Sequence, residues 1–102
     1  MNVIHDNKTM RFTLLFSLYI TVNGRYEMAK DISVLADHNG ISSRDFQSIF
    51  RYLQEEELIE PRKGENEYHA GLTHKGLKAV EEVFFDVNQK TYYFPSYAEM
   101  QK

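Results

Sequence analysis

Apolar side chains recur at helical spacing along most of this chain, and the first such stretch spans residues 8–22. It carries two neighbouring apolar stripes, Phe12, Leu15, Phe16 and Tyr19, and Met10, Leu14 and Leu18. Because so much of its circumference is apolar, we expect one face to pack in the core and the other to meet either a partner or the C-terminal segment folded back. Asn23 and Gly24 predict its end, since both accept the left-handed conformation of a helix C-terminus. The polar residues 1–7 predict a loose terminus.

Two shorter helices follow, with a tight turn between them. Residues 26–28 predict a very short strand, and residues 29–37 predict a helix that stops at Asn39-Gly40. Ser42 or Ser43 caps the next helix, with Asp45 three residues after Ser42 as in a capping box. The i, i+3, i+4, i+7 spacing of one buried face is present at Phe46, Ile49, Phe50 and Leu53.

A β-hairpin is predicted after this third helix. Two short extended runs, residues 58–63 and 68–73, flank a polar tip that contains Gly64. Pro61 lacks a backbone donor, so we expect the first run to form an edge strand.

A fourth helix and an aromatic tail complete the pattern. Thr73 predicts the N-cap of a helix that ends near Asp86 or Val87. Its expected inward positions are Leu77, Val80, Val83 and Phe84. The tail carries Tyr92, Tyr93, Phe94 and Tyr97, with Pro95 among them. It is too aromatic for a disordered linker, so we divide the chain into a domain at 1–87 and a tail at 88–102 that docks on the domain or on a dimer partner.

Composition narrows the class of protein. A chain of 102 residues with 42% hydrophobic residues fits one domain. It has no cysteine, which excludes disulfides and thiolate metal sites. Since no apolar run is long enough to cross a membrane and no cleavage pattern of a signal peptide is visible, we expect a cytoplasmic protein. The net charge of −3 weighs against nucleic-acid binding, although the position of the charges matters more than their sum.

Three motifs suggest how these elements assemble. Ala36 and Gly40, followed by Phe46, have the small, turn and apolar residues of a helix-turn-helix. Residues 52–60 have the pattern of a recognition helix that runs into a first wing strand, with Glu57 where glycine is common. Leu72-Thr73-His74-Lys75-Gly76 has the pattern of a second wing strand that leads into the following helix.

In this order, residues 8–85 resemble the winged helix-turn-helix domains of bacterial regulators such as the MarR-like and PadR-like groups. The resemblance implies a mainly α fold with a small β-hairpin wing, ordered α-β-α-α-β-β-α. It also implies a DNA-binding transcription regulator whose third helix enters the major groove while the hairpin touches the backbone. The residues expected to contact DNA are Ser42, Ser43, Arg44, Gln47, Ser48, Arg51, Arg62 and Lys63. Carboxylates at the end of the third helix and in the wing argue against a broad positive surface. They are Glu55, Glu56 and Glu57 in the helix and Glu65 and Glu67 in the wing.

We also expect a homodimer that reads a pseudo-palindromic site. The residues expected to form its interface are Leu14, Leu18, Phe84, Tyr92, Tyr93 and Phe94. Two alternatives stay open. In the first, the fold binds a protein and not DNA, through the tyrosines of the tail. In the second, a small molecule binds between the first helix and the tail.

Catalysis finds little support in the sequence. The histidines are scattered, at His5, His38, His69 and His74, and only the last two are near each other, without a third ligand. The aspartates lie at expected caps or helix surfaces, at Asp31, Asp37 and Asp45. No phosphate-binding glycine loop is present. We therefore expect no enzymatic activity, no metal and no cofactor.

Overall fold

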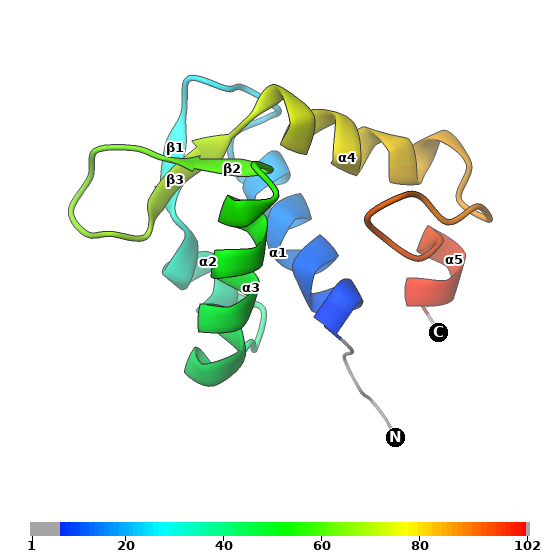
Figure 1. The fold of residues 1–102 in the computed structure, drawn as a ribbon, viewed down its shortest axis with the longest axis horizontal. Coiled ribbons are helices and arrows are strands. Elements are labelled where there is room, and N and C mark those ends of the chain that lie inside the picture. The colour runs from blue at the N-terminus through cyan, green and yellow to red at the C-terminus, as the bar shows by residue number, and fades with distance from the viewer. Residues whose placement is uncertain (1–6, 102) are drawn as a thin grey trace.

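The computed structural model describes residues 7–101, which form five helices and a three-stranded antiparallel sheet (Figure 1). The elements are α1 (Asn7–Thr21), β1 (Ala29–Asp31), α2 (Ile32–His38), α3 (Ser43–Glu55), β2 (Ile59–Pro61), β3 (His69–Leu72), α4 (His74–Phe85) and α5 (Tyr97–Met100). The loose terminus predicted at residues 1–7 lies outside the described residues, apart from Asn7, which is already helical. The predicted order of elements is present, and α5 follows as a helix that the sequence analysis did not predict.

The sheet has the order β1-β3-β2, so the hairpin of β2 and β3 is extended on its other side by β1. Ala29 pairs with Gly71, and Ile59 pairs with Leu72. The strand predicted at residues 26–28 is therefore wrong, since the paired residues are three positions later, in a segment assigned to the second helix. Asp31 decides this boundary, because its carboxylate accepts a 2.9 Å hydrogen bond from the Ser33 N–H and so caps α2.

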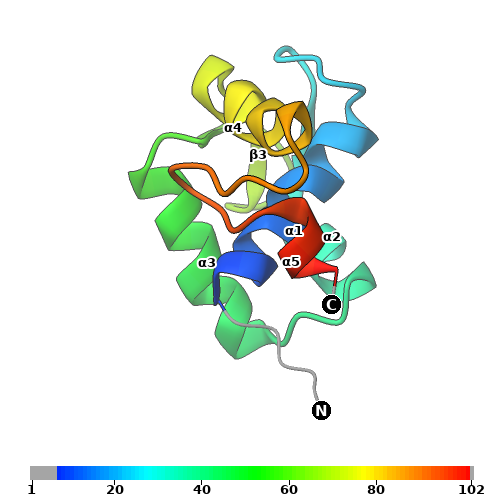
Figure 2. The same cartoon turned by 90° about the vertical axis from the view of Figure 1, so that its right-hand side faces the viewer.

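The hydrophobic core surrounds α1, which packs against α2, α3, α4 and β3. The tail folds back over this helix, and Figure 2 shows α5 in front of α1. The Phe94 side chain is 2% exposed, and its ring centroid lies 5.2 Å from that of Phe12. The Tyr97 ring packs on Phe12 and, at 4.9 Å, on Phe84. The part of α1 around Phe12 is thus covered by the chain's own tail.

This packing corrects the residues expected at a dimer interface. Leu14, Leu18 and Phe94 are buried within the chain, so they are not available to a partner in this conformation. Phe84 was expected to point inward, yet it is 39% exposed because it lies at the rim of the aromatic cluster. Tyr92 is 87% exposed.

Three helices end in the same C-terminal motif. After α1, α2 and α3, a residue with positive φ occupies the position beyond the C-cap: Asn23 (54°), Gly40 (71°) and Glu57 (61°). At the end of α3, the Leu58 N–H donates to the Leu53 carbonyl and the Glu57 N–H to the Gln54 carbonyl, which is a Schellman motif. Glu57 therefore has a left-handed backbone conformation, in which its Cβ lies too close to the following carbonyl oxygen.

We expect Glu57→Gly to raise the free energy of unfolding by about 1 kcal/mol, because relief of the left-handed strain exceeds the extra entropy of glycine in the unfolded chain. Urea unfolding measures this change. Glu55→Gly is the matched control, since it removes a neighbouring carboxylate from a helical position, where glycine lowers stability by about 0.5–1 kcal/mol. A Glu57→Gly protein less stable than the parent would contradict the assignment of strain.

Candidate nucleic-acid interface

The two faces of α3 differ sharply in exposure. Phe46, Ile49, Phe50 and Leu53 are buried, which confirms the predicted core face. The opposite face is exposed along its length, at Ser43, Arg44, Gln47, Ser48 and Arg51. Ser42 caps the helix, where its hydroxyl accepts a 3.2 Å hydrogen bond from the Asp45 N–H. Neither the tail nor another element covers this face.

The hairpin is fixed against α3 by Tyr68, a residue that was not among the predicted site residues. Its ring packs edge-on against Phe46 and Phe50, with centroids 5.0 and 5.3 Å away. The Gln47 side-chain amide donates a 2.8 Å hydrogen bond to the Tyr68 hydroxyl. Gln47 is therefore oriented by the wing, so α3 and the hairpin act as one surface.

The tip of the hairpin is tied to the start of α2. The Asn66 side-chain amide donates a 2.9 Å hydrogen bond to the Asp31 carboxylate, and its carbonyl accepts one of 2.8 Å from the Tyr68 N–H. Burial alone would raise the pKa of the Asp31 carboxyl, but hydrogen bonds from Ser33 and Asn66 outweigh it and lower that pKa below its usual value. The Asp31 carboxylate thus stays ionised and helps to hold the wing in place.

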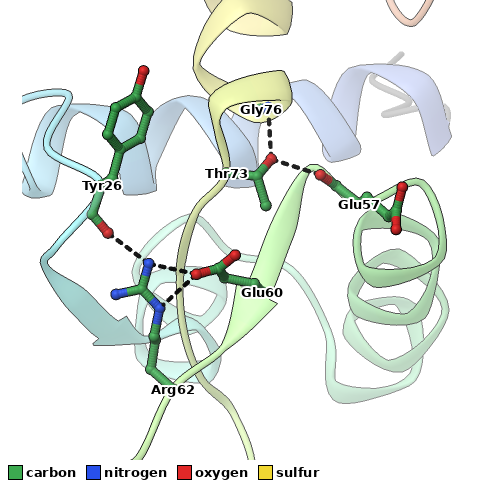
Figure 3. Close-up of polar contacts among 6 residues, drawn as sticks. All are labelled: Tyr26, Glu57, Glu60, Arg62, Thr73 and Gly76. Carbon is green, nitrogen blue, oxygen red and sulfur yellow. Dashed lines mark hydrogen bonds and ion pairs between the residues drawn. The ribbon is translucent and has the colours of Figure 1, made fainter.

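The Arg62 side chain was expected to contact a DNA phosphate, but it is already engaged by groups of its own chain. Its guanidinium forms an ion pair with the Glu60 carboxylate at 2.7 Å and donates a 2.7 Å hydrogen bond to the Tyr26 carbonyl (Figure 3). These contacts join β2 to the loop before β1 while neutralising the charge of Arg62. Lys63, the next residue, is exposed.

The free charges around this surface include at least as many carboxylates as cations. The cations are Arg44, Arg51 and Lys63, all exposed. Asp45 lies in the first turn of the same helix, and Glu65 and Glu67 lie exposed in the wing. Attraction to phosphates is therefore local rather than spread over a continuous positive face.

The end of α3 and the start of α4 lie in close contact. The Thr73 hydroxyl donates a 2.6 Å hydrogen bond to the Glu57 carbonyl and accepts one of 2.9 Å from the Gly76 N–H, which confirms Thr73 as the predicted cap (Figure 3). A Cβ added at Gly76 would lie 2.0 Å from the carbonyl oxygen of Leu58. Only glycine allows α4 to start so close to the end of α3.

Within residues 7–101, the other candidate sites have fewer of the side chains that their function would need. This part of the chain has no cluster of three or more metal-ligating side chains, and His74 is paired with the Tyr26 hydroxyl. His5 lies outside the described residues. A groove of about 590 Å³ runs between α1, the end of α2 and α5, in the region where a small-molecule pocket is one of the open alternatives. None of the described helices is long and apolar enough to span a bilayer.

Comparisons with protein-family models, with curated proteins and with solved structures found no match to this chain.

Proposed function

We propose that the described part of the predicted domain, residues 7–87, is a winged helix-turn-helix that binds duplex DNA with sequence preference, as a transcription regulator of the cytoplasm. The observation that carries this proposal is the uncovered face of α3 beside a hairpin fixed against it. α3 has 13 residues and is about 20 Å long, and a B-DNA major groove about 12 Å wide accepts such a helix.

The spacing of the two arginines suits base recognition. Arg44 and Arg51 are seven residues apart, which is two helical turns or about 10.5 Å, close to the rise of three base pairs. Each guanidinium has the fork of donors that binds guanine through O6 and N7. Gln47 and Ser48 lie between them, where an amide and a hydroxyl can read a base edge or position a phosphate.

The ends of the surface are suited to the DNA backbone. Ser42 and Ser43 lie at the N-terminus of α3, where hydroxyls and helix N–H groups attract phosphate oxygens. We assign the phosphate contact of the wing to Lys63 rather than to Arg62, because Glu60 already engages the Arg62 guanidinium. The acids nearby make non-specific affinity low, so binding rests on base contacts more than on total charge.

Selection from a random duplex pool tests this function. We expect a short motif rich in guanine to be enriched, and binding to it to weaken with salt at a slope of about −2 to −3 in log–log form, as for about three neutralised phosphates. The unselected pool, at the same salt, is the control. If no sequence is enriched at low salt, the proposal fails, and protein binding becomes the function of this surface.

A further inference from the structure

The outward face of α4 carries an unusual apolar residue. Phe85, the last residue of the helix, is 94% exposed. Tyr92, which lines the same hollow, and Val87, two residues later in the chain, are also exposed. Phe85 and Tyr92 line one hollow and so leave a contiguous apolar surface in water, whereas apolar residues that are exposed singly are ordinary. The residues of α4 that face the core, Gly76, Ala79, Val80 and Val83, do not include it.

The outward face has a coiled-coil spacing. Lys75, Lys78, Glu82 and Phe85 are separated by three, four and three residues, which places them in one stripe along α4. Lysines occupy its N-terminal half, and an acid and an aromatic ring its C-terminal half. Within residues 7–101, neither Lys78 nor Glu82 forms an ion pair.

We propose that this stripe binds a second copy of the same chain, with the two α4 helices antiparallel about a two-fold axis. In that register Lys78 of each chain faces Glu82 of the other, and Phe85 faces Lys75. A parallel pairing would instead place lysine against lysine and acid against acid. The charge pattern therefore complements itself only in the antiparallel arrangement.

The surface next to the stripe can receive the exposed ring. A shallow hollow of about 470 Å³ follows α4, and Tyr93 of the tail forms one wall. The Lys75 ammonium lies 5.7 Å from the centre of the Tyr93 ring. A Phe85 ring from the second copy would pack there against an aromatic face and a cation.

This association does not rest on the proposed DNA binding, because no residue of the stripe lies on α3 or the wing. In Figure 1, α4 lies along the top of the molecule and the N-terminal end of α3 at the bottom. A pairing through α4 therefore leaves the α3 face uncovered. α4 has 12 residues and is about 18 Å long, so the interface is small and we expect weak association that becomes visible only at high protein concentration.

Sedimentation equilibrium without DNA tests the inference. We expect the wild-type chain to approach twice its monomer mass as its concentration rises through the dissociation constant. Lys78→Glu and Glu82→Lys should each weaken association by about 10-fold, since each places like charges together twice across the axis. The double variant Lys78→Glu/Glu82→Lys should restore it, because the opposite charges face each other again.

Phe85→Ser should weaken association by about 30-fold or more, because it removes the aromatic ring at both ends of the interface. Val34→Ser, which alters another exposed apolar residue on α2, is the matched control and should leave association unchanged. All of these positions are exposed, and circular dichroism checks that each variant folds. A wild-type monomer at millimolar concentration overturns the inference, as does an unaffected Phe85→Ser or a double variant as weak as the single ones.

Discussion

The Arg44→Ala/Arg51→Ala protein is expected to bind a selected duplex about 100-fold or more weakly than the parent. A bidentate contact from arginine to guanine contributes about 1–3 kcal/mol, and two such contacts on separate turns of α3 act nearly independently. Both side chains are exposed, so the free energy of unfolding should change by no more than about 0.5 kcal/mol. Fluorescence anisotropy with a labelled duplex measures the loss.

A second double variant separates base contacts from loss of charge. Arg25 and Lys90 are exposed but lie outside the proposed surface, so Arg25→Ala/Lys90→Ala removes the same two charges elsewhere. We expect that control to weaken binding by less than about threefold, since only long-range attraction is reduced. If the two double variants lose equal affinity, or the first loses none, the assignment of α3 as the reading helix is wrong.

Gly76→Ala is expected to lower the free energy of unfolding by about 3 kcal/mol or more, although alanine is the better helix former. The added Cβ would meet the Leu58 carbonyl oxygen at 2.0 Å, and a backbone oxygen cannot move aside as a side chain can. Leu58 is itself buried, and its carbonyl accepts a hydrogen bond from the Thr73 N–H. For a domain of this size, thermal unfolding should shift downward by more than about 10 °C.

Gly40→Ala is the matched control for this change. Gly40 has a φ of 71°, but a Cβ there would meet nothing within 4 Å. It therefore isolates the strain of a left-handed alanine, about 1–2 kcal/mol, from a clash. Gly76→Ala should be the more damaging of the two, and equal losses would show that α4 can shift away from Leu58 at little cost.

The local features of the chain were predictable where one residue type decides them. Ser42 and Thr73 cap α3 and α4 as expected, because a side-chain oxygen three residues before a free N–H is a short-range signal. The same signal exists at Ser96, whose hydroxyl accepts a hydrogen bond from the Glu99 N–H at the start of α5. That helix was missed because it has only four residues and too little sequence to show a period.

Other positions depended on partners distant in the sequence. β1 is displaced from its predicted place because its residues pair with β3, about 40 positions later. Arg62 was expected to face DNA, yet Glu60 and the Tyr26 carbonyl engage it. Tyr68 gave no signal as a site residue, since its role appears only when the hairpin lies against Gln47.

The amino-acid order by itself determined α1, α3 and α4, the caps of α3 and α4 and the face of α3 that is buried, because periodicity and capping act over a few residues. Only the tertiary structure decided which apolar side chains remain exposed to solvent. The tail buries Phe94 against α1, whereas Phe85 stays exposed to solvent. Which of the two is buried depends on how segments distant in the sequence pack into the same core.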